Sequence, residues 1–125
     1  KYLPDDFKKR HYTTVGELYY DWVIDGMELV TKPGGTAFGT GINDMVICAK
    51  TGTAQNPHGQ DHSLYIAFAP REKPKIAIAV IVENGGYGAT WAAPIANLMI
   101  ENYLNRGKSP ARPDMLERIK TSAVQ

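Results

Sequence analysis

The sequence predicts an α+β domain built on an antiparallel sheet, in the order helix, three strands, helix. Apolar residues recur at helical spacing in two segments, 14–30 and 91–105. Between them, segments 45–55, 63–69 and 75–83 are strand candidates, and the third is rich in Ile and Val, which favour strands. Only short polar segments connect these strands. Short connections join antiparallel neighbours, because parallel pairs need long crossovers.

The first helix is expected over residues 14–30. Thr14 and Glu17 have the spacing of a capping box, in which both side chains satisfy free N–H groups at a helix start. The apolar residues of one face follow: Val15, Leu18, Tyr19, Trp22, Val23, Met27 and Val30. We expect this face, Trp22 included, to be buried in the core. The segment 32–35, Lys-Pro-Gly-Gly, should end the helix, since proline cannot continue its hydrogen bonds.

The strand at 75–83 is the clearest of the three. It and residues 46–49 are apolar at both alternations, which predicts that helices cover both sides of the sheet. A tight turn at 84–88 leads to the second helix, with Pro94 in its first turn, where a missing N–H costs little. The face of this helix expected to be buried holds Ile95, Leu98, Met99, Tyr103 and Leu104.

Length and composition are those of one globular domain. The chain has 125 residues, of which 43% are hydrophobic and 22% are charged. Fourteen basic and thirteen acidic residues leave a net charge of +1, which gives no electrostatic basis for nucleic acid as a partner. The longest aliphatic run, 76–82, is far shorter than the roughly twenty residues of a membrane-spanning helix.

Residue 1 is Lys rather than Met, so we expect the chain to be a piece of a longer protein. The folded part is expected at about 13–107, followed by a tail at 108–125. We expect that tail to hold one helical turn around Leu116 and Ile119. The first twelve residues are polar and are expected to be solvated.

The strongest chemical signal is Lys50-Thr51-Gly52-Thr53 on the first predicted strand. A P-loop is excluded, because Ala49 rather than glycine precedes the lysine. A lysine cation can hold an anionic substrate, a threonine hydroxyl can hydrogen-bond a carboxylate, and glycine lets a substrate approach the backbone. The next residue can offer its N–H to a developing oxyanion. Taken alone, the tripeptide also fits an ordinary lysine at a strand end.

The surroundings of the motif add a longer pattern. It comprises 49–55 (AKTGTAQ), 67–70 (AFAP) and 83–86 (ENGG), with 25–27 (DGM) and 35–37 (GTA) upstream. From about residue 22 to 104, the chain resembles the C-terminal part of the transpeptidase domain of class B penicillin-binding proteins. It is most similar to the penicillin-binding protein 2 group, the cell-elongation enzymes of Gram-negative bacteria. The resemblance implies a partial penicillin-binding transpeptidase (β-lactamase-like) fold: three antiparallel strands of a normally five-stranded sheet, flanked by helices.

The resemblance also implies a function, D,D-transpeptidation of peptidoglycan stem peptides through a serine acyl-enzyme, with β-lactams as acylating analogues. It implies that Lys50 belongs to the proton relay and helps to hold the substrate carboxylate. Thr51 would bind that carboxylate beside Gly52, and Thr53 would supply an oxyanion-hole N–H and contact the substrate. The implied location is the periplasmic face of the inner membrane. The implied partners are a SEDS-type glycosyltransferase and the elongation complex, and no cofactor is implied.

The family also has a Ser-x-x-Lys and a Ser-x-Asn motif, and Ser63, Ser109 and Ser122 make neither. We therefore expect the chain to form one wall of an active site and to be inactive alone. Two other function classes stay open: a β-lactam-sensing receptor domain on the same fold, and a non-catalytic interaction module. We also expect the chain alone to self-associate, either edge to edge through the strand 75–83, whose outer edge would lack a partner, or by exchanging a terminal segment.

Three weaker signals are interpreted as structural. His58 and His62 have part of a helical metal-binding motif, but Pro57 predicts a loop, so no metal is expected. Cys48 lies in an apolar strand and is expected to be an inert buried thiol. The glycines of 85–88 could bind an anion at the start of a helix, but a sharp turn is the favoured interpretation.

Overall fold

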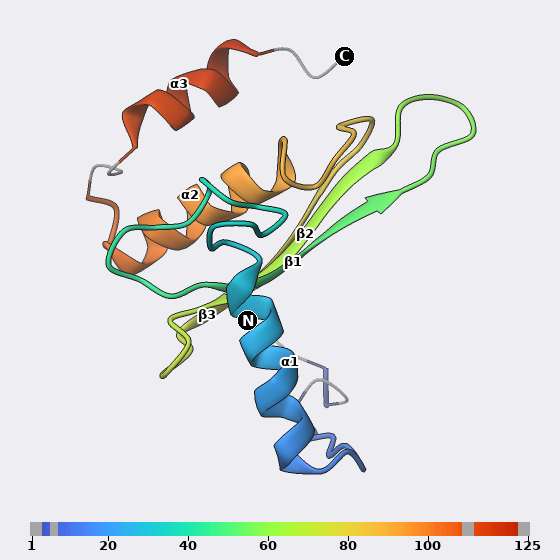
Figure 1. Ribbon diagram of the computed structural model, residues 1–125, viewed down its shortest axis with the longest axis vertical. Helices are drawn as coiled ribbons and strands as arrows, with labels where there is room; N and C mark the ends of the chain where they lie inside the picture. The colour runs from blue at the N-terminus through green and yellow to red at the C-terminus, as the bar shows by residue number, and fades with distance from the viewer. Residues whose placement is uncertain (1–3, 6–7, 109–111, 123–125) are drawn as a thin grey trace.

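The computed structural model describes residues 4–5, 8–108 and 112–122. The elements are α1 (Glu17–Leu29), β1 (Cys48–Ala54), β2 (His62–Ala69), β3 (Ile76–Val82), α2 (Ala92–Leu104) and α3 (Pro113–Thr121). Figure 1 shows α1 leaving the sheet on one side, while α2 and α3 lie on the other. The predicted fold class is confirmed: an α+β arrangement with three antiparallel strands flanked by helices.

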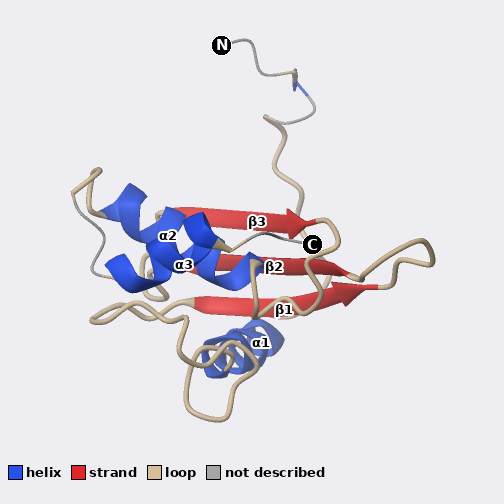
Figure 2. Cartoon of the chain, turned by 90° about the horizontal axis from the view of Figure 1, so that it is seen from above, coloured by secondary structure: helices blue, strands red, loops and turns tan. Residues whose placement is uncertain are grey.

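The sheet has the order β1-β2-β3, and both pairs are antiparallel. Lys50 is paired with Ile66, which is paired with Ala79, so these three residues share one face. The opposite face packs against α2, which contacts both β2 and β3 (Figure 2). β1 and β3 are therefore the two edges. Among the described residues, no strand pairs with either outer edge.

The core lies between this second face and α2, and small side chains let the helix approach the sheet closely. Its buried residues include Ala49, Tyr65, Ala67, Ala93, Ala96 and Ile100. The predicted buried face of α2 is only partly correct: Leu98 is buried, but Met99 and Tyr103 are exposed. Alanine is weakly hydrophobic, so helical periodicity assigned the contact face to the larger apolar residues.

The predicted core face of α1 is wrong for the first two turns of the helix, whereas Val30, just after its end, packs against the core as expected. Trp22 is 61% exposed, and Leu18, Tyr19 and Val23 are also exposed. In the described part of the chain α1 packs against β1, and its N-terminal part extends away from the sheet (Figure 1). Periodicity identifies an apolar face, but it does not show which element covers that face.

The N-terminus of α1 also differs from the prediction. The helix begins at Glu17, after an N-cap Gly16 that makes no side-chain capping hydrogen bond. The hydroxyl of Thr13 accepts a hydrogen bond from the N–H of Val15 at 3.0 Å. The capping box expected from Thr14 is therefore not formed.

Ion pairs hold the other end of α1. The Nη2 atom of Arg71, in the β2–β3 turn, lies 2.5 Å from Oδ1 of Asp25, and its Nη1 pairs with Glu28. The N–H of Arg71 donates to the carbonyl of Val46, two residues before β1. These contacts fix the last turns of α1 beside the start of the strand that carries the Lys-Thr-Gly motif.

Among the described residues, α1 covers the face of the sheet away from α2 near β1. Met27 of α1 lines a pocket with Ile66 and Ala79, but Ile66 is 52% exposed and Ile81 is 65% exposed. The expectation of helices on both sides of the sheet is therefore wrong for β2 and β3 within the described residues. The outer edge of β3 has no partner strand there, and self-association through it stays a prediction.

The expected helical turn around Leu116 and Ile119 is confirmed and is longer than expected, since α3 has nine residues. The guanidinium of Arg118 lies 5.9 Å from the ring centre of Trp91, which precedes α2.

In the described part of the chain, no helix is long and apolar enough to cross a membrane.

A buried polar network ties α2 to the loop before β1. The amide nitrogen of Asn97, which is fully buried, donates to the carbonyl of Thr40 at 2.8 Å. The hydroxyl of Tyr65 donates to Oδ1 of Asn97 at 3.2 Å. Burial raises the pKa of Tyr65 to about 12, although the hydrogen bond with Asn97 lowers it.

This pKa predicts a loss of stability at high pH. The unfolded chain ionises Tyr65 near pH 10, so its contribution to the free energy of unfolding is fully present below that pH. It is lost as the pH rises through about 12. We expect the thermal midpoint to fall over this range, and to fall less in Tyr65→Phe. An equally steep fall in that variant would contradict the assignment.

Candidate active site

The Lys-Thr-Gly motif lies in β1, at an edge of the sheet. Lys50 and Gly52 are on the face shared with Ile66, whereas Thr51 and Thr53 are on the α2 face. The outer edge of the strand is the one place that all four residues share. A molecule that contacts the whole motif must therefore lie along this edge.

Two hydrogen bonds order the motif. The Nζ atom of Lys50 donates to the carbonyl of Thr51 at 2.7 Å, and the lysine side chain is exposed. The hydroxyl oxygens of Thr51 and Thr36 are 2.9 Å apart and form a hydrogen bond. A cation and a pair of hydroxyls thus lie next to one another on the strand edge, a combination suited to an anionic ligand.

A cavity of about 640 Å³ opens beside the motif. Its walls are the motif residues, the segment 87–90 that precedes α2, and Thr36. Its volume is in the range of small-molecule sites. The cavity therefore brings together three segments that are far apart in the sequence: the turn after α1, β1, and the loop after β3.

The loop after β3 is fastened to the sheet. The hydroxyl of Ser63, on β2, donates to the carbonyl of Tyr87 at 2.9 Å and accepts from the N–H of Ala92 at 3.1 Å. Gly88 lies directly on the strands: an added Cβ atom would be 2.3 Å from the carbonyl oxygen of Leu64 and 2.8 Å from that of Gly52. The second wall of the cavity is therefore held at a fixed distance from the motif.

Ser63 has a structural role in this arrangement. The residue is fully buried, and its hydroxyl both donates and accepts a hydrogen bond. An attacking serine must reach its substrate, whereas this hydroxyl is buried and bonded to two backbone groups.

The sequence placed the motif correctly on the first strand but missed part of its surroundings. Residues 84–88 form the expected turn, and the loop that continues to Thr90 is also a wall of the cavity. Thr36 was part of the segment Gly35-Thr36-Ala37 that supported the resemblance. The hydrogen bond to Thr51 could not be foreseen, because the two threonines are fifteen positions apart.

The remaining candidates lie elsewhere or are structural. Nδ1 of His62 accepts a hydrogen bond from the N–H of Asn84, and the N–H of His58 donates to Asn56. No group of three or more His, Cys, Asp or Glu residues that could hold a metal occurs among the described residues. Cys48 is fully buried, and burial raises the pKa of its thiol, which agrees with an inert core residue.

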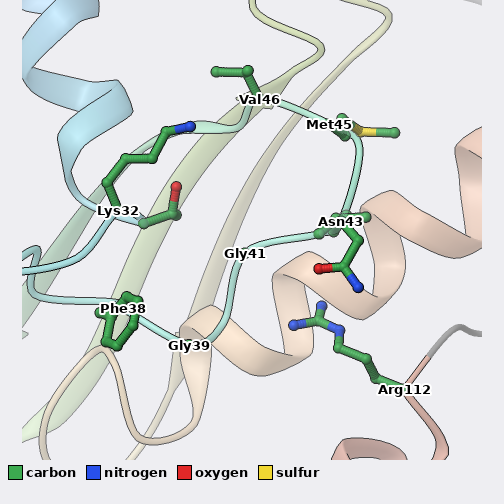
Figure 3. A pocket seen from close by; sticks show the side chains of 10 residues that line it. Lys32, Phe38, Gly39, Gly41, Asn43, Met45, Val46 and Arg112 are labelled. Atoms are coloured by element: carbon green, nitrogen blue, oxygen red, sulfur yellow. The ribbon is translucent and has the colours of Figure 1, made fainter.

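A second pocket, of about 300 Å³, lies between the end of α1, the loop before β1, and Arg112. Figure 3 shows Arg112 and Asn43 pointing toward one another across it. Nη1 of Arg112 donates to the carbonyl of Thr40 at 2.9 Å, and Nη2 lies 3.9 Å from the buried carboxylate of Glu101. The pocket contains no motif residue, and Arg112 serves to tie the C-terminal segment to the loop.

The family described as Penicillin binding protein transpeptidase domain matches residues 6–101. The chain belongs to this family of penicillin-binding transpeptidase domains. Among curated relatives, it is 48% identical over 71 residues to the peptidoglycan D,D-transpeptidase PbpA of Mycobacterium tuberculosis, covering 48% of this chain and 14% of that protein. It is 41% identical over 83 residues to MrdA of Acinetobacter baumannii, covering 54% and 12%.

Solved structures agree with this assignment. Pseudomonas aeruginosa PBP2 in complex with WCK 5153 superposes with a TM-score of 0.63 at 38% identity, over 74% of this chain and 21% of that one. The penicillin G acyl-enzyme of M. tuberculosis penicillin-binding protein A gives 0.59 at 35%, over 72% and 21%. The PBP2–MreC complex of Helicobacter pylori gives 0.60 at 28%, over 73% and 18%.

The relatives and structural neighbours are of the PBP2 type, so the chain is a class B, PBP2-like member of the family. It spans less than a quarter of the length of each of these proteins. The resemblance to class B penicillin-binding transpeptidases, inferred from the AKTGTAQ, AFAP and ENGG segments, is confirmed.

Proposed function

We propose that the chain is the C-terminal part of a peptidoglycan D,D-transpeptidase, and that the outer edge of β1 holds the stem peptide. One observation carries the proposal: the Lys-Thr-Gly-Thr segment lies on an open strand edge that faces a cavity. An extended peptide can pair with such an edge through its main chain, while the neighbouring side chains select its terminal group.

Each motif residue has a role in this proposal. The Lys50 cation attracts the substrate carboxylate and supports proton transfer at the serine. The Thr51 hydroxyl donates to that carboxylate, and Gly52 leaves room for the peptide to reach the strand. The N–H of Thr53 stabilises the oxyanion that forms on the attacked carbonyl.

The reaction forms and breaks one ester. A serine of the full-length protein attacks the D-Ala-D-Ala carbonyl, the amide C–N bond breaks, and D-alanine leaves with a proton. An amine of a second stem peptide then attacks the acyl-enzyme ester. The serine oxygen leaves and regains its proton, and the new amide is the crosslink.

The names of the relatives support this choice over a β-lactam-sensing receptor or an interaction module, since they are peptidoglycan D,D-transpeptidases. The acyl-enzyme and MreC complexes of the structural neighbours support β-lactams and an elongation complex as partners. We extend the proposal to a SEDS-type glycosyltransferase partner and to a location on the periplasmic face of the inner membrane.

The test is covalent labelling of the full-length protein by a fluorescent penicillin, together with release of D-alanine from a stem-peptide analogue. We expect one penicillin bound per active site and loss of labelling after preincubation with unlabelled β-lactam. A full-length protein that is neither labelled nor able to release D-alanine would contradict the proposal.

The 125 residues expressed alone should not be labelled. None of the three serines begins a Ser-x-x-Lys motif, and the hydroxyl of Ser63 is buried and hydrogen-bonded. Intact mass after incubation with penicillin measures this directly, with the full-length protein as the positive control. A covalent adduct on Ser63, Ser109 or Ser122 would show that these 125 residues do contain a serine nucleophile and would contradict the prediction.

A further inference from the structure

The turn after α1 brings a second hydroxyl to the motif. Oγ1 of Thr36 lies 2.9 Å from Oγ1 of Thr51, and both residues line the cavity beside β1. Thr36 belongs to another element than the motif, so its place at the site depends on how the turn is held.

The backbone around Thr36 is fixed on both sides. Gly35 lies against the end of α1: an added Cβ atom would be 2.1 Å from the carbonyl oxygen of Leu29. Ala37 is 1% exposed, and its N–H donates to the carbonyl of Val30 at 2.9 Å. A glycine packed against backbone and a buried alanine thus hold Thr36 between them, facing β1.

Each hydroxyl group has one proton to donate and two lone pairs that can accept, which limits the hydrogen bonds that Thr36 and Thr51 can make together. When Thr51 gives its proton to a carboxylate, its oxygen still has lone pairs that can accept from Thr36. A donor bonded to that oxygen polarises the Thr51 O–H bond and fixes its direction, because hydrogen bonds in a chain strengthen one another.

We propose that Thr36 is a positioning residue for recognition of the substrate's terminal carboxylate: it donates to Thr51 and turns the Thr51 hydroxyl toward that carboxylate. This inference rests on the proposed function and deepens it. The ligands affected are acyl donors with a free carboxylate, namely stem peptides ending in D-alanine and penicillins. Neutral esters of the same molecules are affected less, because an ester carbonyl accepts a weaker hydrogen bond than a carboxylate.

The experiment uses the full-length protein and variants Thr36→Val and Thr36→Ser. Valine keeps the shape without the hydroxyl, and serine keeps the hydroxyl. We measure the second-order rate of acylation by benzylpenicillin and by its methyl ester. Thr36→Val should lower the rate with the acid by about threefold to tenfold, the size expected for one net hydrogen bond. The rate with the ester should fall less, so the ratio of acid to ester rates should drop, and Thr36→Ser should restore the wild-type ratio.

A Thr51→Val background provides the second readout. Without the Thr51 hydroxyl, Thr36→Val should have no further effect, because the chain of donors is already broken. If Thr36→Val also weakens folding, the ratio of the acid rate to the ester rate still tests carboxylate recognition, because a loss of folded protein lowers both rates by the same factor.

The inference is overturned if the wild-type protein is acylated but Thr36→Val leaves the ratio of acid to ester rates unchanged. It is also overturned if the loss persists in the Thr51→Val background. In both cases the proposed function stands. If the wild-type protein itself is not acylated, the proposed function fails and the inference fails with it.

Discussion

Replacement of Lys50 by alanine in the full-length protein should lower the rate of acylation by a fluorescent penicillin at least about a hundredfold. That is the scale for removing a group that transfers protons or stabilises charge at the reacting atoms. The side chain lies exposed on the open edge of β1, at the cavity, so its loss leaves the core intact. Stopped-flow or gel-based labelling over a range of penicillin concentrations measures the effect.

Two further variants accompany Lys50→Ala: one tests carboxylate recognition, and the other is a control outside the site. Thr51→Val should weaken carboxylate recognition by about 1.5–3 kcal/mol, the usual value for a hydrogen bond to a charged group. Lys73→Ala removes an exposed lysine in the β2–β3 turn, away from the cavity, and should leave the rate unchanged. Wild-type rates in both Lys50→Ala and Thr51→Val would show that the site has been assigned to the wrong residues.

Replacement of Gly88 by alanine should damage the site from its other wall. The added Cβ atom would be 2.3 Å from the carbonyl oxygen of Leu64, so the loop must move away from the sheet. A displacement of about 1 Å near reacting groups can cost as much as a hundredfold in rate. We expect acylation to fall at least about tenfold and the free energy of unfolding to fall by about 1–3 kcal/mol, as in overpacked cores.

Gly26 is the matched control for this variant. It lies within α1, and an added Cβ atom would meet nothing within 4 Å. Gly26→Ala should therefore raise stability by about 0.5–1 kcal/mol, the usual gain for alanine in a helix, and leave acylation unchanged. Equal acylation rates in Gly88→Ala and Gly26→Ala would contradict the close packing of the loop on the motif.

The strands were predictable because their signals are local. The three apolar runs are separated by short polar turns, and this alone fixes their order and antiparallel pairing. The turn at 84–88 and the helix after it follow equally from glycine, proline and periodicity. The structure moves the ends of these elements by at most three residues, as expected for boundaries set by tertiary contacts.

The surface of the helices was less predictable, because burial depends on the partner. Trp22 lies on a regular apolar face but is 61% exposed. The N-terminal part of α1 extends away from the sheet (Figure 1), where no described element covers that face. In α2 the buried face includes three alanines and the polar Asn97 and Glu101, whereas the larger Met99 and Tyr103 are exposed. Hydrophobic size and helical periodicity can be read from one segment of sequence, whereas burial also depends on a second segment that packs against it.

The same distinction applies to the site. The motif on β1 could be found from its residue types, since each has a chemical role at adjacent positions. Its partners Thr36 and Tyr87 come from turns on either side in the sequence, and only the fold brings them to one cavity. Likewise Ser63 could be dismissed from its sequence context, but its role in anchoring the loop is visible only in three dimensions.

The most direct test of the central claim is a crystal structure of the full-length protein acylated by benzylpenicillin. We predict that the drug lies along the outer edge of β1, with its carboxylate within hydrogen-bond distance of the Thr51 hydroxyl. The acyl carbonyl oxygen should accept from the N–H of Thr53, and Tyr87 to Thr90 should form the opposite wall. An adduct whose carboxylate and carbonyl make no contact with Thr51 or Thr53 would contradict the account.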